Sequence, residues 1–339
     1  MSLSEVTTLR LGGPAQSCVV AHSESDLIEA VSSSDARNEP VLIVAGGSNL
    51  VVSDDGFAGR VVLVRTSGIE IDQDACSGAM VTVAAGETFD ELVRLAVANG
   101  WVGLEALSGI PGSVGATPIQ NVGAYGQEVA DTIVRVRVWD RRKRAVRTFM
   151  HADCDFSYRM SAFKRDPERF VILTVTFQFP LGDLSAPIVY AELARSLDVA
   201  PGERAPSVAV REQVLALRRG KGMVLDPADH DTWSAGSFFM NPILTPEQAE
   251  LLPEAAPRHP QRDGRVKTSA AWLIDHAGFG KGYAGNGVSL STKHPLALTN
   301  RGAGTAANLM ELASEVRSGV QDVFGITLEI EPVLVGIAW

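Results

Sequence analysis

Residues 107–126 read LSGIPGSVGATPIQNVGAYG, a stretch in which glycine, proline, serine and asparagine outnumber large apolar side chains. The stretch has neither helical nor strand periodicity. A segment this long and this poor in packing side chains usually has a function when it lies inside a globular chain. Its glycines let the backbone pass close to a flat ligand with many hydrogen-bonding groups. A purely structural Ω-loop is the alternative.

A second glycine-rich loop, VAGGSNL at residues 44–50, follows the apolar run VLIV at residues 41–44. Glycines permit positive φ and let backbone N–H groups converge on an anion such as a phosphate. Ser48 and Asn49 add side-chain donors. The loop is neither GxGxxG nor GxxxxGK[ST], so the sequence does not support a Rossmann or P-loop site. A tight turn without a ligand is an equal alternative.

Strands and helices are predicted on both sides of these loops. Short apolar or alternating runs predict strands at 41–44, 61–64, 81–84, 133–138, 170–177 and 327–336. Helical spacing predicts a helix capped by Ser23, a helix from Phe89 to the stop at Asn99-Gly100, a helix from Ser207 to about Arg219, and a long helix over 305–324. Glycine and proline between residues 220 and 227 indicate a domain crossing.

Composition narrows the class of protein. A chain of 339 residues predicts two or three domains. The net charge of −10 argues against a nucleic acid or an anionic membrane as partner, because it leaves no basic face. An anionic small ligand is still compatible with this charge, since it needs only a few local cations. The sequence indicates no obligatory protein partner. No secretory signal and no membrane-spanning run are visible, so we expect a soluble, cytoplasmic protein.

The cysteines do not predict a disulfide or a metal site. Cys18, Cys76 and Cys154 are far apart, odd in number and outside any CxxC or Cys/His spacing. We therefore expect no metal, and three buried free thiols in a reducing compartment.

Taken together, the loops and five shorter motifs resemble the UDP-N-acetylenolpyruvoylglucosamine reductases, which have an FAD-binding fold of the vanillyl-alcohol-oxidase (PCMH) type. The motifs are TLRLGGP at 8–14, FSYRMS at 156–161, AGSFFMNP at 235–242, AWLID at 271–275 and LEIEP at 328–332. Each is weak alone, but together they span nearly the whole chain in the family's order.

The resemblance implies an α+β fold with two α/β subdomains that bind FAD and a C-terminal α+β domain that binds substrate. We expect subdomain 1 at residues 1–66, subdomain 2 at residues 67–222 together with a returning final strand at 326–339, and the substrate domain at residues 223–325. The residues implied at the cofactor are Ala45, Gly46, Gly47, Ser48, Asn49, Leu50, Ser108, Gly109, Pro111, Gly112, Ser113, Gly115, Ala116, Gln120, Asn121, Gly123, Ala124 and Tyr125.

The activity implied by the resemblance is the reduction of UDP-N-acetylglucosamine enolpyruvate to UDP-N-acetylmuramate, a step of peptidoglycan synthesis, with FAD as cofactor and NADPH as hydride donor. Hydride addition at C3 of the alkene requires that charge spreading into the carboxylate be stabilised and that C2 be protonated. Arg159 matches the family's arginine at the carboxylate, Ser237 the proposed proton donor, and Glu331 the C-terminal glutamate. A surface ion pair is the alternative for Arg159, and a turn or cap for Ser237.

Four further residues match positions at which the family contacts the UDP-sugar: Tyr190, Lys221, Asn241 and His294. The loop around Tyr190 makes the chain similar to the longer of two family types. The segment Trp272-Leu273-Ile274 is expected in the core instead.

Two other functions compete with this interpretation. An oxidase of the same flavin fold would share the glycine loops without needing Arg159, Ser237 and Glu331 together. A carrier or regulatory protein that binds UDP-sugars without turnover would be isolated without flavin.

Overall fold

The computed structural model describes residues 1–339. The chain forms two compact units. Unit 1 comprises Met1–Ala15, Gly47–Phe57 and Gly220–Trp339, and unit 2 comprises Gln16–Gly46 and Ala58–Arg219. None of the helices has both the length and the apolar character needed to cross a membrane.

The helices and strands are as follows. The helices are α1 (Glu24–Ala36), α2 (Phe89–Ala98), α3 (Ala162–Arg165), α4 (Ala191–Ser196), α5 (Ser207–Gly220), α6 (Pro246–Glu250), α7 (Ala270–His276) and α8 (Ala306–Phe324). The strands are β1 (Ala15–Ala21), β2 (Val41–Val44), β3 (Leu50–Val52), β4 (Phe57–Val64), β5 (Ile69–Asp74), β6 (Gly78–Ala84), β7 (Gly123–Ala124), β8 (Gln127–Glu128), β9 (Ile133–Asp140), β10 (Ala145–Met150), β11 (Phe170–Phe179), β12 (Ile243–Leu244), β13 (His259–Pro260), β14 (Val266–Lys267), β15 (Val288–Leu290), β16 (Leu298–Asn300) and β17 (Val333–Val335).

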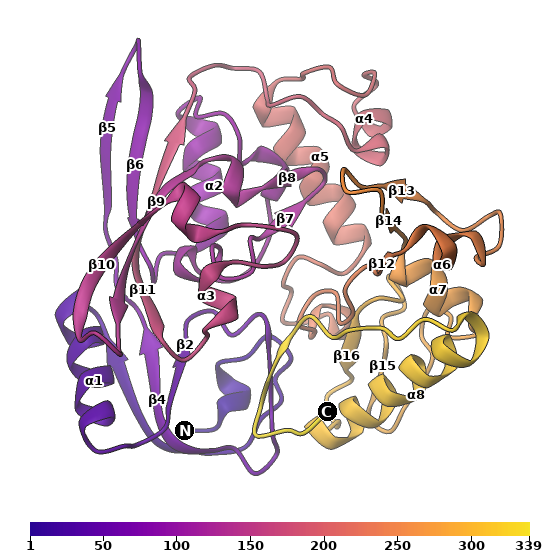
Figure 1. Cartoon of the computed structure of the whole chain (residues 1–339), viewed down its shortest axis with the longest axis horizontal. Coiled ribbons are helices and arrows are strands. Elements are labelled where there is room, and N and C mark those ends of the chain that lie inside the picture. The colour runs from indigo at the N-terminus through magenta and orange to yellow at the C-terminus, as the bar shows by residue number, and fades with distance from the viewer. The chain divides into compact units, whose positions relative to one another are not determined.

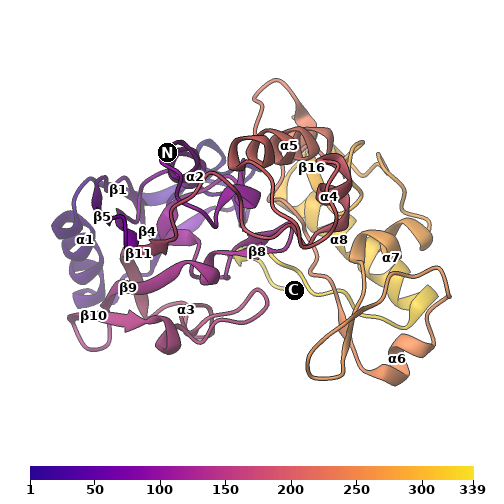
Figure 2. The ribbon, with the colours of Figure 1, turned by 90° about the horizontal axis from the view of Figure 1, so that it is seen from above.

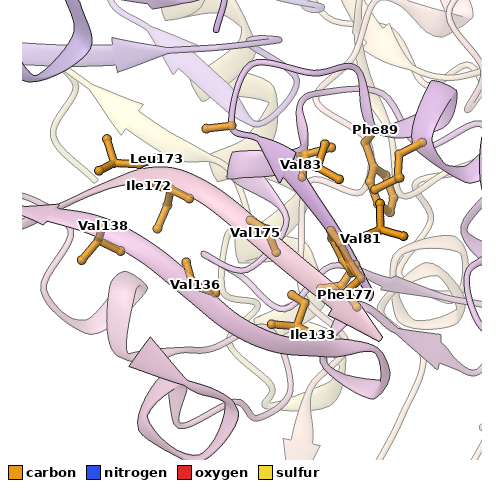
Figure 3. Close-up of a cluster of buried hydrophobic side chains, with 14 of the residues drawn as sticks. Val81, Val83, Phe89, Ile133, Val136, Val138, Ile172, Leu173, Val175 and Phe177 are labelled. Atoms are coloured by element: carbon orange, nitrogen blue, oxygen red, sulfur yellow. The ribbon is translucent and has the colours of Figure 1, made fainter. Parts of the chain in front are cut away.

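A five-stranded antiparallel sheet with the order β10-β9-β11-β6-β5 dominates unit 2 (Figure 1). Side chains alternate between the two faces of such a strand, so one face of it can be buried. Val175 on the central strand β11 lies opposite Val83 of β6 and Val136 of β9. Figure 3 shows these valines and their neighbours gathered with Phe89 of α2 in one buried apolar cluster. This core holds α2, and the turn before it, against the sheet.

A smaller sheet with the order β1-β4-β2 carries the first glycine-rich loop at the end of β2. Helix α1 precedes β2, and the predicted cap is confirmed: Ser23 and Asp26 form a capping box. The apolar run 41–44 pairs in parallel with β4, as its continuous hydrophobicity suggests.

Unit 1 is built around α8, which begins after the capping Thr305 and ends at Gly325 in the left-handed conformation. Its apolar face, including Leu309, Leu312 and Val316, packs in one core with α7 and the hairpin β15–β16. Figure 2 shows α7 and α8 side by side. Leu273 and Ile274 belong to that core, as predicted.

Most of the predicted elements are confirmed, but the end of the chain differs from the prediction. The strand expected over 327–336 is limited to Val333–Val335. It pairs in parallel with β3, at residues 50–52, and not with the segment 67–222. The contacts accordingly divide the chain into two units whose bounds differ from the three regions that the resemblance implies.

The prediction for the cysteines was wrong in part. Cys154 is buried, but Cys18 and Cys76 are exposed. Cys18 lies on β1 and Cys76 in the turn between β5 and β6, where a small side chain need not be covered.

Candidate active site

The two glycine-rich loops meet within unit 2 through bare backbone. A Cβ atom added at Gly46 would lie 2.6 Å from Cα of Gly112, which is closer than side chains approach backbone in proteins. Gly112 has φ +114°, a conformation that L side chains rarely adopt. Glycine is therefore required at both positions, and the surface there is made of peptide groups.

The second loop is fixed to the turn between β6 and α2. The N–H of Phe89 donates to the carbonyl of Gly112 at 3.0 Å, and the N–H of Val114 donates to the carbonyl of Glu87 at 2.8 Å. Ser113 lies between these bonds, and its buried Oγ has no hydrogen-bond partner in the protein. A buried hydroxyl of this kind costs free energy unless a partner arrives from outside the chain. A glycine-rich loop with an unsatisfied buried hydroxyl fits a cofactor rich in acceptors, as FAD is.

Other residues of the same loop have partners in the protein. Ser108 Oγ donates to the carbonyl of Glu105 at 2.7 Å and is fully buried. A Cβ atom at Gly115 would meet Cβ of Ala85 at 2.5 Å, so this glycine is required by packing. The resemblance implies that Ser108 and Gly115 lie at the cofactor. In the structure Ser108 is bonded to Glu105, and Gly115 packs against Ala85.

Asp90, in the first turn of α2, joins the loop to α5. Its carboxylate accepts from the N–H of Gly109 at 2.6 Å and from both terminal nitrogens of Arg211 at 2.7 and 2.9 Å. Burial opposes the ionisation of Asp90, but hydrogen bonds from Arg211 and Gly109 outweigh it, so the pKa of this carboxyl lies below its usual value. Asp90 therefore carries a negative charge that fixes the start of the loop.

Arg159 lies against the far end of the glycine-rich segment. Its Nη2 donates to the carbonyl of Gly123 at 2.8 Å, and its own backbone is left-handed with φ +55°. Asn121 is only 1% exposed, and its Nδ2 donates to Glu128 at 2.7 Å and to the carbonyl of Ser157 at 3.2 Å. The segment implied at the cofactor and the turn that carries Arg159 are thus one hydrogen-bonded structure.

Tyr190 and Tyr125 are in contact, with ring centroids 5.3 Å apart in an edge-to-face arrangement. Tyr125 is left-handed with φ +49°, and Tyr190 is 43% exposed just before α4. A polar ring that rests on another ring while remaining open to solvent can cover a ligand.

Ser237 and Glu331 lie on neighbouring backbone in unit 1. The N–H of Glu331 donates to the carbonyl of Phe238 at 2.9 Å, and the N–H of Met240 donates to the carbonyl of Glu329 at 2.9 Å. Phe238 is buried, whereas Ser237 and Glu331 are half-buried. The two backbone segments that carry these predicted catalytic residues, 94 positions apart in the sequence, are therefore hydrogen-bonded to each other.

The first glycine-rich loop continues into the same part of unit 1. The carbonyl of Asn49 accepts from the N–H of Val333 at 2.9 Å, two residues beyond Glu331. Gly47 has φ +59°, and a Cβ atom there would meet the carbonyl oxygen of Val6 at 1.9 Å. Only glycine fits this turn.

The predicted substrate residues of unit 1 are His294, Asn241 and Lys221. His294 begins a turn in which its carbonyl accepts a hydrogen bond from the N–H of Ala297 at 3.1 Å. The carbonyl of Leu296, in the same turn, accepts from the N–H of Phe238 at 2.8 Å. Asn241 Oδ1 accepts from the N–H of Ala270 at the start of α7, at 2.9 Å. Lys221 follows α5 directly and is half-buried.

The remaining predicted cofactor residues lie on the two loops. Ala45 accepts a hydrogen bond from Arg65 through its carbonyl at 2.9 Å, and Leu50 opens β3. Ser48, Pro111, Gln120 and Ala124 are half-buried, and Ala116 is exposed. No group of three or more His, Cys, Asp or Glu side chains could hold a metal ion.

Sequence reasoning does not single out Asp90 or Arg211. An acidic residue in the first turn of a helix ordinarily faces solvent and favours the helix dipole, so Asp90 has no distinguishing signal. The only available signal is the position of Asp90 in the chain, at the start of the helix between strand β6 and the glycine-rich segment.

Comparisons with known proteins agree with this architecture. Residues 15–148 match the FAD binding domain family, and residues 226–335 match the family described as UDP-N-acetylenolpyruvoylglucosamine reductase, C-terminal domain. The chain is therefore an α+β protein with an FAD-binding domain followed by that C-terminal domain, as the sequence predicts.

Similar proteins cover nearly the whole chain. The UDP-N-acetylenolpyruvoylglucosamine reductase of Cutibacterium acnes is 56% identical over 98% of this chain and 89% of its own length. The protein of the same name from Streptomyces avermitilis is 52% identical over 99% of this chain and 94% of its own length. The crystal structure of UDP-N-acetylenolpyruvylglucosamine reductase from Thermus caldophilus has a TM-score of 0.67 at 24% identity, covering 99% of this chain and 97% of that one, and shows the same fold.

Proposed function

The chain belongs to the UDP-N-acetylenolpyruvoylglucosamine reductase family, and we propose that it reduces UDP-N-acetylglucosamine enolpyruvate to UDP-N-acetylmuramate, with NADPH as the hydride donor. It is an FAD-dependent oxidoreductase of peptidoglycan precursor synthesis. The pairing of the backbone around Ser237 with that around Glu331 is the observation that carries the finer proposal.

The reaction places clear demands on the protein. An enolpyruvyl ether accepts hydride at C3 only if the negative charge that develops at C2 is shared with the carboxylate and stabilised there. C2 must then receive a proton on the same time scale. When bound and reduced, FAD supplies the hydride. The chain must therefore supply a cation, a proton donor and a way to hold the carboxylate.

Arg159 is the cation in this proposal. A guanidinium keeps its charge at any physiological pH and can donate two parallel hydrogen bonds to a carboxylate. Its bond to the carbonyl of Gly123 orients the planar group at the end of the glycine-rich segment. In this proposal the guanidinium donates hydrogen bonds to the substrate carboxylate when the substrate binds.

In this proposal Ser237 acts at C2 and Glu331 at the substrate carboxylate. A serine hydroxyl is a weak acid in water, but it can protonate a strongly basic carbanion at short range. The buried rings of Phe238 and Phe239 anchor the turn, and Gly236 with φ +76° lets the chain reverse just before Ser237. Glu331, on the adjacent backbone, would donate a hydrogen bond to the substrate carboxylate while protonated.

The nucleotide part of the substrate is assigned to four residues. Lys221 supplies a positive charge for the diphosphate, Tyr190 covers the sugar nucleotide, and Asn241 and His294 add hydrogen bonds. We also propose that the reaction takes place in the cytoplasm, because UDP-sugars and NADPH are highly charged and do not cross membranes unaided.

An anaerobic absorption experiment tests this function. The purified protein is expected to show a flavin spectrum that bleaches with NADPH and returns when UDP-N-acetylglucosamine enolpyruvate is added. Bleaching that is reversed only by air would indicate an oxidase of the same fold. A colourless protein that binds no added FAD would contradict the proposal altogether.

A further inference from the structure

Asn121 belongs to the segment that the sequence assigns to the cofactor, yet its side chain is used inside the protein. Only 1% of the residue is exposed. Nδ2 donates to Glu128 Oε2 at 2.7 Å and to the carbonyl of Ser157 at 3.2 Å, and Oδ1 accepts from the N–H of Ala130 at 3.2 Å. The donors and the acceptor of the carboxamide are thus all engaged, with residues 128–130 on one side and Ser157 on the other.

The bond to Ser157 is important because Ser157 begins the turn that carries Arg159. Ser157 and Met160 close this turn with two backbone hydrogen bonds, at 3.0 and 3.1 Å. Arg159 is at its tip, with a left-handed φ of +55°. A non-glycine residue in this conformation is held there by its surroundings, because the conformation is disfavoured for a residue with a Cβ atom.

A second side chain fastens the other end of the same turn. Ser161 is fully buried, donates to the carbonyl of Ile119, and accepts from the N–H groups of Phe163 and Lys164. Lys164 Nζ in turn donates to the carbonyl of Arg159 at 3.0 Å. The turn is therefore bonded to residues 119–121 at both ends.

The guanidinium of Arg159 contacts the same segment. Nη2 donates to the carbonyl of Gly123 at 2.8 Å, and Nη1 lies 3.4 Å from where a Cβ atom of Gly123 would be. The turn that contains the backbone of Arg159 is therefore bonded to Ile119 and Asn121, and its guanidinium is bonded to Gly123. Asn121, with φ +45°, is the member of that segment whose side chain reaches the turn.

We propose that Asn121 is a positioning residue for Arg159: its carboxamide, oriented by Glu128 and Ala130, holds the arginine turn against the glycine-rich segment through Ser157, so that the guanidinium presents its charge at one place. The inference rests on the proposed role of Arg159 at the substrate carboxylate. A cation displaced by about 1 Å can lose about 100-fold in rate, because stabilisation of developing charge depends steeply on geometry.

The test uses the full chain loaded with FAD and the two half-reactions measured separately. Asn121→Gly removes the carboxamide and keeps the left-handed backbone accessible. Asn121→Asp keeps the shape but loses both donors beside Glu128. Both variants are expected to keep the wild-type affinity for FAD and the wild-type rate of flavin reduction by NADPH. Flavin reoxidation by UDP-N-acetylglucosamine enolpyruvate should slow by about 10- to 100-fold, mainly in the maximal rate.

Asn38→Gly is the matched control, since Asn38 is also a left-handed asparagine of unit 2, with φ +51°, but is exposed in the turn after α1. It should leave both half-reactions unchanged. Melting temperatures of the variants without FAD separate a general loss of stability from the expected kinetic effect.

A double-mutant cycle then decides how Asn121 acts. If it acts through Arg159, adding Asn121→Gly to Arg159→Ala should change reoxidation by less than about 2-fold, since coupled residues are not additive. Fully additive effects, wild-type behaviour of both Asn121 variants, or loss of FAD with equal slowing of both half-reactions would overturn the inference. Wild-type reoxidation in Arg159→Ala alone would instead overturn the proposed role of Arg159.

Discussion

A Cβ atom on Gly46 would lie 2.6 Å from Cα of Gly112, so the two glycine-rich loops of unit 2 are in backbone contact. The contact joins the end of β2 to the segment before Ser113, two places that the sequence separates by more than sixty residues. An added methyl group would have to move one loop, because neither side of the contact has a flexible side chain that could yield.

Gly46→Ala is therefore expected to separate the loops. Overpacking of a rigid contact costs about 1–3 kcal/mol, and the displaced peptide groups should bind FAD more weakly. Thermal melting of the apoprotein and titration with FAD measure the two effects. Gly182→Ala is the control, since its Cβ atom would meet nothing nearer than Val102 Cγ2 at 3.7 Å. Equal affinity for FAD in both variants would contradict the assignment of the loops to the cofactor.

Ser237→Ala should slow one half-reaction of the catalytic cycle and leave the other unchanged. Flavin reduction by NADPH is expected at the wild-type rate, whereas reoxidation by the enolpyruvyl substrate should slow by about 100- to 10,000-fold, the contribution of a positioned proton donor. Stopped-flow absorbance of the flavin follows both steps. Ser237→Cys retains a proton donor at the same position and should recover part of the rate. Equal slowing of both steps would mean a damaged cofactor site and not a lost acid.

Asp90→Asn should remove a pH-dependent contribution to stability. Because Arg211 and Gly109 hold the pKa of Asp90 below its usual value, the carboxylate stabilises the fold above the unfolded pKa of about 4, and this contribution is lost as the pH falls through the folded pKa. At pH 7 the variant should lose about 1–3 kcal/mol of unfolding free energy, with a smaller difference from wild type below about pH 4.

Urea unfolding at several pH values measures this difference. Asp72→Asn, an exposed carboxylate on β5, should be nearly neutral at every pH tested. A difference between Asp90→Asn and wild type that grows with acidification would have the wrong sign for the proposed network.

The cysteines are expected to differ in reactivity. Burial, with a smaller effect of Asp153, raises the pKa of the Cys154 thiol to about 12, so the reactive thiolate is scarce at neutral pH. Cys18 and Cys76 are exposed. A disulfide reagent should therefore titrate two thiols in the folded protein and three after denaturation. Cys154→Ser should leave the native count at two, and Cys76→Ser should lower it to one; rapid native labelling of Cys154 would contradict the structure.

Local signals predict much of this fold. The capping box of Ser23 and Asp26, the apolar spacing of α8 and its terminal Gly325 are encoded within a few residues, and each is found as expected. The apolar, partly alternating run of β11 likewise predicts a strand. Such elements depend on neighbours in the sequence, which the sequence itself displays.

Pairings between distant segments are not encoded in this way. Nothing near Val333 indicates that its partner is Leu50, so the expected place of the last strand came from resemblance and was wrong. The same is true at the site: Asn121 looks like a cofactor residue by its position in a glycine-rich segment. The sequence does not reveal that its buried carboxamide points toward Ser157 and Glu128, the contacts on which the proposed positioning role rests.

The parallel pairing of β17 with β3 also bears on the order of events during synthesis. Unit 1 collects Met1–Ala15 and Gly47–Phe57 with the C-terminal segment from Gly220 onward. Met1–Ala15 and Gly47–Phe57 are bonded to each other, but β3 must wait for its partner β17 until residue 335 has been translated and has left the exit tunnel. Translation speed and nascent-chain chaperones should therefore affect the yield of unit 1 more than that of unit 2, whose segments are complete at Arg219.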